Sequence, residues 1–196
     1  MRGAWRWSLS FLVAAALFGG ASRLAARVFL TQEQALARAF PAPQTSERRT
    51  LFLDAEQAGR VEALAGSPLR RSVVPYYVGL LEGRITGYAY FDTHLVRTLP
   101  ETIVVSLGAD GRITAIEILS FDEPEDYLPR ERWLRQFDGR RLDDDLSLKG
   151  AIRGLTGATL SSRSVTAATR RILAIHRLFV AGAASGEQKG GGEARQ

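Results

Sequence analysis

Small and hydroxyl-bearing residues are concentrated in Thr156–Ser162, which reads Thr-Gly-Ala-Thr-Leu-Ser-Ser. A helical pattern follows at once, and the free backbone amides at the start of a helix favour an anion. Gly157 lets the main chain approach a ligand closely, and four hydroxyl groups add hydrogen-bonding capacity. The segment has the outline of a phosphate site. A second interpretation stays open, because Thr or Ser before a helix often serves only as its cap.

Other kinds of chemistry lack the residues they need. The chain contains no cysteine, which excludes thiolate zinc sites, iron–sulfur clusters, cysteine-linked haem, disulfides and cysteine nucleophiles. Any redox chemistry must therefore use an organic cofactor. Dinucleotide, nucleoside-triphosphate, triad-hydrolase and zincin motifs are also missing. The acidic runs 122–126 and 143–145 lack the spacing of a calcium loop, so we expect no metal.

The positive charge of the chain is not a nucleic-acid signal. The net charge is +5, but Arg2, Arg6 and Arg23 lie within residues 1–26, where no acidic residue occurs. The remainder is close to neutral, which gives no electrostatic footprint for DNA or RNA. We therefore expect no nucleic-acid partner.

The motif Thr156-Gly157-Ala158-Thr159, followed by Leu160-Ser161-Ser162, resembles the Ser/Thr-Gly-Ala-Thr motif of the FMN-binding domain family. That family includes the flavin-carrying subunits of Rnf and sodium-pumping NADH:quinone reductase complexes. The similarity covers most of residues 31–180. It includes Thr31-Gln-Glu-Gln-Ala-Leu leading to Phe40-Pro41, Gly87-Tyr88, Asp110-Gly111-Arg112-Ile113 and the closing helix.

The resemblance implies a covalent cofactor. FMN would be attached through a phosphoester to the Thr159 hydroxyl by a flavin transferase that uses FAD and a divalent metal. The neighbouring cofactor-binding residues would be Thr156, Gly157, Ala158, Leu160, Ser161 and Ser162. One departure is Arg153, where family members commonly carry aspartate.

Two loops and two histidines are considered as neighbours of the flavin ring. We expect the loops Leu99–Thr102 and Phe121–Tyr127 to lie around it. His94, at a predicted strand end, is expected to be an ordinary satisfied polar residue, and His176 to lie on a helix surface without a role.

The resemblance and the exported amino terminus together imply an electron carrier that relays electrons between membrane redox partners outside the cytoplasm, without catalytic residues of its own. Two alternatives remain. One is an enzyme, a flavin-dependent reductase of a small exported substrate. The other is a flavin-free interaction module of a membrane complex, in which Thr159 merely caps its helix.

The amino terminus predicts the compartment. Sixteen uncharged, mostly apolar residues lie between Arg6 and Arg23. As a helix they would reach about 24 Å, somewhat short of the roughly 30 Å hydrocarbon core. We expect a single-pass anchor in the cytoplasmic membrane with the body on the periplasmic side; a cleaved signal peptide is the alternative.

The remaining patterns predict an α+β fold, an antiparallel sheet of two hairpins packed with helices. Capping-box patterns predict helices at 31–40 and 55–65. Strand patterns around Glu82-Gly83 and Asp110-Gly111 predict the hairpins 73–81/84–91 and 102–107/112–119. A short helix from Pro129 carries Trp133 and Phe137. Apolar spacings of three and four predict an amphipathic helix from Leu160 to about Val180, with Arg163, Arg170, Arg171 and Arg177 on its other side.

The domain organisation follows from these segments. We expect residues 1–30 to form a signal-anchor or signal peptide and residues 183–196 a polar, glycine-rich, disordered tail. The resemblance implies that residues 31–182 form the FMN-binding domain.

Overall fold

The computed structural model describes residues 27–143 and 145–182. The predicted membrane segment and the predicted tail lie outside the described residues. Within those two ranges, none of the helices combines the length and the apolar character that crossing a membrane requires.

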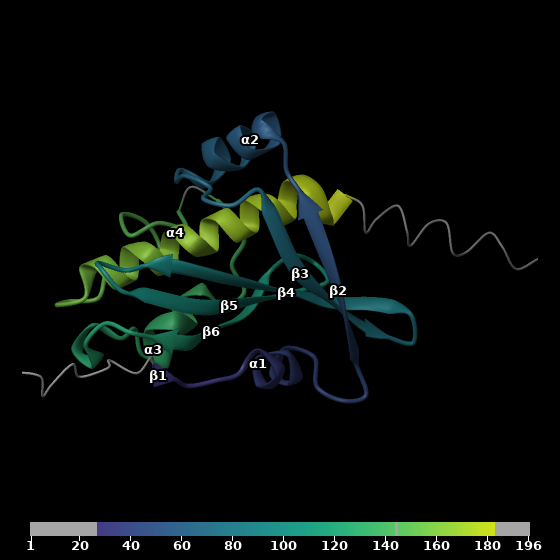
Figure 1. Ribbon diagram of the computed structural model, residues 1–196, viewed down its shortest axis with the longest axis horizontal. Coiled ribbons are helices and arrows are strands. Elements are labelled where there is room, and N and C mark those ends of the chain that lie inside the picture. Colours follow the sequence, from purple (N-terminus) through teal and green to yellow (C-terminus); the bar gives the residue numbers. More distant parts are fainter. Residues whose placement is uncertain (1–26, 144, 183–196) are drawn as a thin grey trace, which may run out of the picture.

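A six-stranded antiparallel sheet with the order β1-β6-β5-β4-β3-β2 forms the centre of the fold (Figure 1). The predicted hairpins are confirmed as β3–β4 and β5–β6, although β4, β5 and β6 extend beyond the predicted ends. The strands are β1 (Arg27–Val28), β2 (Thr45–Phe52), β3 (Val73–Leu81), β4 (Arg84–Leu95), β5 (Pro100–Gly108) and β6 (Ile113–Phe121).

The outer strands β1 and β2 were not predicted. β2 carries Glu47, Arg48 and Arg49 and is mostly exposed, so it lacks the apolar alternation of a half-buried strand. It pairs with β3 along its whole length, from Thr45 opposite Leu80 to Phe52 opposite Val73. Charged side chains on an edge strand hinder pairing with further chains.

Local signals set the short helices. Both capping boxes are present: the Thr31 side chain accepts the Gln34 amide at the start of α1 (Gln32–Ala39), and Asp54 accepts the Gln57 amide at the start of α2 (Ala55–Ala65). The predicted helix after Pro129 is α3 (Glu131–Leu134), continued by a 3₁₀ turn to Phe137. The rings of Trp133 and Phe137 pack edge to face.

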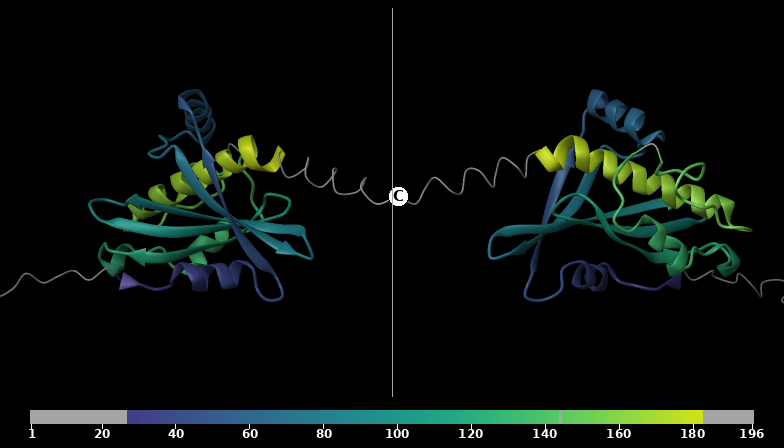
Figure 2. Two further views of the ribbon diagram at one scale, coloured as in Figure 1. Left: turned by 45° about the vertical axis from the view of Figure 1, so that its right-hand side comes forward. Right: turned by 180° about the vertical axis from the view of Figure 1, so that it is seen from behind.

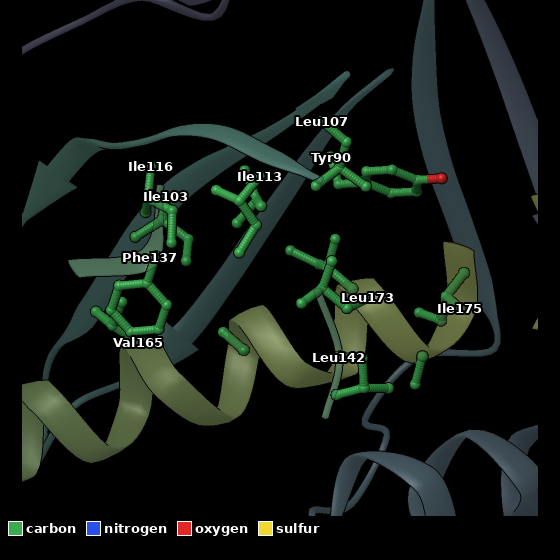
Figure 3. Close-up of a cluster of buried hydrophobic side chains, with 14 of the residues drawn as sticks. Tyr90, Ile103, Leu107, Ile113, Ile116, Phe137, Leu142, Val165, Leu173 and Ile175 are labelled. Carbon is green, nitrogen blue, oxygen red and sulfur yellow. The ribbon is translucent and has the colours of Figure 1, made fainter. Parts of the chain in front are cut away.

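The predicted closing helix is confirmed as α4 (Thr159–Ile175), continued by a π-helical turn, His176–Val180. α4 covers one face of the sheet with α2 beside it, and α1 lies on the opposite face (Figures 1 and 2). Alternation along β4 separates two cores: Tyr88 and Tyr90 pack in the α4 core, whereas Ala89 packs with α1. Figure 3 shows Val165 and Leu173 of α4 against apolar side chains of the sheet.

The prediction for His176 is wrong. Its side chain is buried, its Nδ1 lies 3.0 Å from the Tyr90 hydroxyl, and its ring packs against Tyr88. His176 follows Ile172 by four residues and therefore lies on the apolar face of the helix. Burial lowers the pKa of His176 to about 4. Arg171 also departs from the expected solvent face, because its guanidinium reaches Asp92 of β4.

Candidate functional site

The start of α4 lacks a side-chain cap. Its N-cap residue is Ala158, which has no side-chain oxygen, and Thr159 is the exposed first helical residue. Thr159 therefore does not cap the helix, in contrast to Thr31 and Asp54 of the other helices. The preceding turn requires the glycine, because Gly157 has a φ of +82°. The first-turn amides of α4 and the Thr159 hydroxyl are thus presented together.

The two serines after Thr159 differ in their surroundings. The Ser162 hydroxyl is buried and donates to the carbonyl oxygens of Ala158 and Thr159, at 3.2 and 3.0 Å, so it is used inside the helix. The Ser161 side chain is also buried, yet its Oγ has no hydrogen-bond partner. An unpaired buried hydroxyl is costly unless a ligand or water satisfies it. Ser161 is the one that faces a cavity.

That cavity has a volume of about 280 Å³. Two segments of the structure meet at the first turn of α4 to form it: the β4–β5 loop contributes Val96 and Arg97, and the segment after β6 contributes Glu123 and Tyr127. From the motif, the lining residues are Gly157, Ala158, Thr159, Leu160 and Ser161. Ser162 does not line it, and Thr156 lines a neighbouring cavity with Arg153.

Thr159 stands between two cavities. On its other side lies a space of about 560 Å³, bordered by α2, α4 and the segment before the motif. Lys149, Arg163 and Arg170 line it, which makes this side basic, whereas Leu160 and Tyr127 give the smaller cavity an apolar wall.

Of the two loops that the sequence placed around the ring, Phe121–Tyr127 lines the smaller cavity through Glu123 and Tyr127, whereas no residue of Leu99–Thr102 does. The β4–β5 loop contributes the preceding residues Val96 and Arg97 instead. One boundary is corrected: Pro100, Glu101 and Thr102 belong to β5, because β4 and β5 pair up to Leu95 and Pro100. Glu123 joins the two loops, since its Oε1 accepts the amides of Thr98 and Leu99 at 2.7 and 2.9 Å. These hydrogen bonds hold the pKa of Glu123 below its ordinary value.

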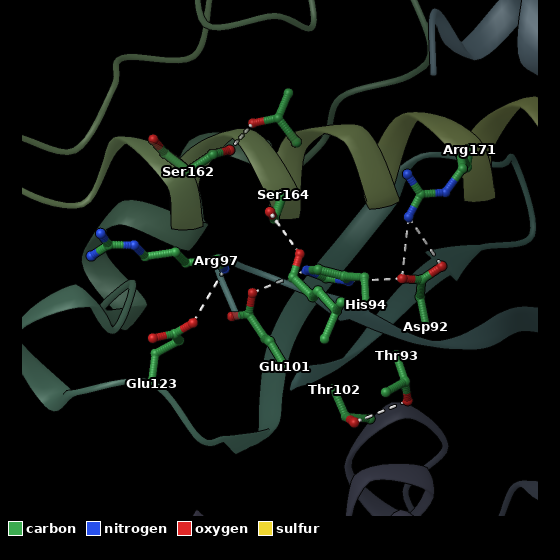
Figure 4. A network of polar contacts seen from close by, with 12 residues as sticks. Asp92, Thr93, His94, Arg97, Glu101, Thr102, Glu123, Ser162, Ser164 and Arg171 are labelled. Carbon is green, nitrogen blue, oxygen red and sulfur yellow. Dashed lines mark hydrogen bonds and ion pairs between the residues drawn. The ribbon is translucent and has the colours of Figure 1, made fainter. Parts of the chain in front are cut away.

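A row of buried and half-buried ionisable groups lies between the sheet and α4 (Figure 4). His94 lies at its centre, 2.8 Å from Asp92 Oδ1 and 3.1 Å from Glu101 Oε2, and Arg171 of α4 contacts the same Oδ1 of Asp92 at 3.3 Å. His94 is thus a satisfied polar residue, as the sequence suggested. Glu101 and Arg171 were not anticipated in this row, because strand pairing brings in Glu101 and the docking of α4 brings in Arg171.

Burial and hydrogen bonding compete in this row. Burial favours a lower pKa for His94, but the hydrogen bonds and charges of Asp92 and Glu101 outweigh it and raise the pKa. Burial raises the pKa of Glu101, and His94 offsets this only in part. For Asp92, burial acts upward, but the contacts with His94 and Arg171 lower the pKa overall. Oε1 of Glu101 has no partner.

Arg153, the departure from the motif, is fixed through its backbone. Its amide donates to Gln136 Oε1 at 2.9 Å, and its carbonyl oxygen accepts Trp133 Nε1 at 2.7 Å. The exposed Arg153 side chain lines the cavity that also contains Thr156, together with Arg130 and Arg132.

In the comparisons with known proteins, the family model of the FMN-binding domain matches residues 99–174. This range begins in the β4–β5 loop and contains the whole motif and most of α4. No curated protein and no solved structure matches the chain, so the resemblance to Rnf and quinone-reductase subunits stays a prediction. The match over residues 99–174 supports FMN as the cofactor and suggests a flavin-binding, electron-transfer role.

Proposed function

We propose that this protein is an electron carrier that holds FMN covalently, through a phosphoester between Thr159 Oγ1 and the FMN phosphate. The observation that carries this proposal is the exposed Thr159 hydroxyl at the uncapped start of α4, on the lip of a cavity. A helix start without a side-chain cap leaves amides for a phosphate.

The residues present fit such a group. Ser161 offers a buried hydroxyl without a partner, and Arg97 presents an exposed guanidinium at the same cavity. These two side chains and the first-turn amides would hold the phosphate, while Leu160 and Tyr127 would contact the ring. The cavity is small for a complete ligand pocket, so part of the cofactor would remain exposed to partners.

Attachment requires a flavin transferase, as the resemblance implies. Thr159 Oγ1 forms the new bond to the FMN phosphorus, the phosphoanhydride of FAD breaks, and AMP leaves. The hydroxyl proton passes to a base of the transferase, and a divalent metal held by that enzyme screens the phosphates.

The cavity favours a carrier over a reductase. Bound FMN supplies one- and two-electron transfer. Of the described residues that line this cavity, Glu123 supplies the carboxyl group. Hydrogen bonds from three backbone amides hold this group in its charged form. Glu123 is thus a poor proton donor near neutral pH, which disfavours a substrate site with its own general acid. It instead keeps the 96–99 loop against the segment after β6.

We further propose that residues 7–22 anchor the protein in the cytoplasmic membrane, with the domain on the periplasmic side. A membrane-bound redox complex would then be its donor or acceptor. The apolar, acid-free amino terminus supports this placement. A covalent bond also suits this compartment, because a tethered cofactor cannot be lost by diffusion.

The test is mass spectrometry of the denatured protein after coexpression with a flavin transferase. The expected mass increase equals FMN less one water. Thr159→Val should abolish it, Thr159→Ser should retain it, and Thr156→Val is the matched control because Thr156 lies outside the cavity. An unmodified mass in the wild-type protein would instead favour the flavin-free module. Oxidation of NAD(P)H by the purified protein alone would favour the reductase.

A further inference from the structure

The described chain begins at the same end of the molecule as the Thr159 site. β1 pairs with the last residues of β6, Arg27 opposite Phe121, and Arg27 Nη1 lies 2.6 Å from Glu125 Oε2. A cavity of about 250 Å³ at this place is lined by Phe29 and Glu123. Glu123 also lines the cavity of about 280 Å³ beside Thr159, which we call the Thr159 cavity. In Figure 1, the purple β1 and the green first turn of α4 lie at one end, and the yellow end of α4 lies at the other.

Exposed apolar side chains gather at this end. Of the eight large apolar residues that are exposed among the described residues, five belong to segments that border the Thr159 cavity or the neighbouring cavity at β1. They are Val28 (63% exposed), Phe29 (46%), Leu95 (48%), Tyr127 (37%) and Leu160 (45%). We call these five residues the apolar rim. Such a grouping on a small domain marks a contact surface.

Basic side chains lie beside the apolar rim. Arg130, Arg132 and Arg153 line a cavity of about 650 Å³ that also contains Thr156 of the motif. All three are exposed, and within residues 27–143 and 145–182 their guanidinium groups make no ion pair or hydrogen bond. Apolar and aromatic residues next to free arginines are the composition with which proteins contact anionic lipid surfaces.

The length of chain before Arg27 restricts the orientation. If residues 7–22 span the membrane, the five steps from Ser22 to Arg27 can extend over at most about 17 Å. α4 alone is about 25 Å long, and β4 is longer. The end that carries Arg27 must therefore stay near the membrane, whereas the β3–β4 turn at the far end of β4 is free to point away.

We propose that the apolar rim rests on the outer surface of an anionic phospholipid membrane, with Arg130, Arg132 and Arg153 on lipid phosphates, so that Thr159 is held at the membrane surface. This inference rests on the anchoring part of the proposed function. It places the cofactor site where a membrane-embedded partner can reach it without movement of the domain.

The absence of cysteine allows a direct test with single introduced cysteines. Leu95→Cys and Leu160→Cys report on the rim, and Glu82→Cys in the β3–β4 turn is the exposed control at the far end. The full chain, without flavin, is labelled with a bimane and reconstituted at low density into phosphatidylcholine–phosphatidylglycerol vesicles. Nitroxide-labelled lipid quenches the membrane-contacting sites and iodide quenches the aqueous ones.

We expect lipid quenching at positions 95 and 160 to exceed that at position 82 by about threefold or more, with the reverse order for iodide. Combining Arg130→Gln, Arg132→Gln and Arg153→Gln should reduce the lipid quenching at position 95. Equal iodide access at all three positions overturns the inference, as does protection that appears only at high protein density, which would indicate a second copy. Removal of the chain by alkaline carbonate overturns both anchoring and orientation. None of these readouts depends on whether Thr159 carries FMN.

Discussion

His94 and Glu101 face each other across β4 and β5, with Nε2 of the ring 3.1 Å from Oε2 of the carboxyl group. The other ring nitrogen lies 2.8 Å from Asp92. Because an ionised carboxylate can only accept hydrogen bonds, the His94 Nδ1 must carry a proton and donate it in the hydrogen bond to Asp92. The contact between Nε2 and Glu101 then needs one further proton, held by either partner. Loss of that proton would leave a buried carboxylate next to a nitrogen lone pair, so the pair retains it.

The first prediction concerns the two histidines of the chain, whose pKa values are shifted in opposite directions. The pKa of His94 is raised, because its hydrogen bonds and the charges of its acidic partners outweigh burial, whereas burial alone lowers that of His176 to about 4. In an NMR titration, the His176 ring should remain neutral at pH 5.5. The His94 ring should keep both nitrogens engaged with protons above pH 6.5.

Two histidines give two sets of ring signals, and Gln substitution of each assigns them. Two superimposed titration curves near pH 6.5 would contradict the buried positions of both side chains.

The second prediction concerns the stability that the buried pair provides. Glu101→Ala leaves the buried Nε2 of His94 without its hydrogen-bond partner, which should lower the free energy of unfolding by about 3 kcal/mol or more. Glu101→Gln keeps a side-chain amide that can donate to Nε2 or accept from it, and should cost less. Urea unfolding measures both changes.

The matched control is Glu131→Ala, which breaks the exposed pair between Glu131 and Arg135. Its effect should stay within about 0.5 kcal/mol. Similar losses in Glu101→Ala and Glu131→Ala would show that the buried row contributes no more than a surface pair.

The third prediction is a loss of stability in mild acid that originates at His176. Its pKa is about 4 in the folded chain and near 6.5 when unfolded. Between these values the unfolded state binds more protons, so stability falls as the pH drops below 6.5, by about 2 kcal/mol at pH 5. The raised pKa of His94 acts in another window, because its contribution is complete below pH 6.5 and is lost only at higher pH.

Unfolding at pH 7 and pH 5 measures this loss, and His176→Gln isolates it, since the amide oxygen can still accept the Tyr90 hydroxyl. The variant should lose less stability than the wild type between these pH values. An identical change in the two proteins would assign the acid sensitivity elsewhere.

The fourth prediction concerns the turn that presents Thr159. Gly157→Ala forces an L-residue into a φ of +82° and should cost about 1–2 kcal/mol. The displaced turn should also reduce the fraction of chains that receive FMN, measured by mass after coexpression with the transferase. Gly154→Ala is the control, because Gly154 has no positive φ and an added Cβ meets nothing within 4 Å. Equal effects of the two substitutions would show that neither stability nor flavinylation depends on the positive φ of Gly157.

The fifth prediction concerns Arg153, where the family commonly has aspartate. Arg153→Asp should leave the fold intact, since Gln136 and Trp133 bind only its backbone. It should increase the flavinylated fraction when the transferase is limiting. Arg132→Asp makes the same charge change in the same cavity and should not, so an equal rise in both would indicate a general charge effect.

Local patterns determined much of the fold. Thr31 with Gln34 and Asp54 with Gln57 define two helix starts because each capping box involves residues three apart. The hairpin β3–β4 follows from two strand patterns around one turn. The edge strand β2 was not predicted, because it is stabilised by pairing with β3 and its own sequence lacks a strand pattern. The motif at Thr159 was visible for a similar reason: its glycine and hydroxyl residues are contiguous.

The surroundings of that motif depended on tertiary structure. Glu123 and Thr98 are 25 residues apart, and Asp92 and Arg171 are 79 apart, so no local pattern relates them. The docking of α4 on the sheet places Thr159, Tyr127 and Arg97 around one cavity. The sequence by itself thus determined which hydroxyl stands at a helix start. Only long-range packing, which buries some polar groups and leaves others exposed, decided what lies next to it.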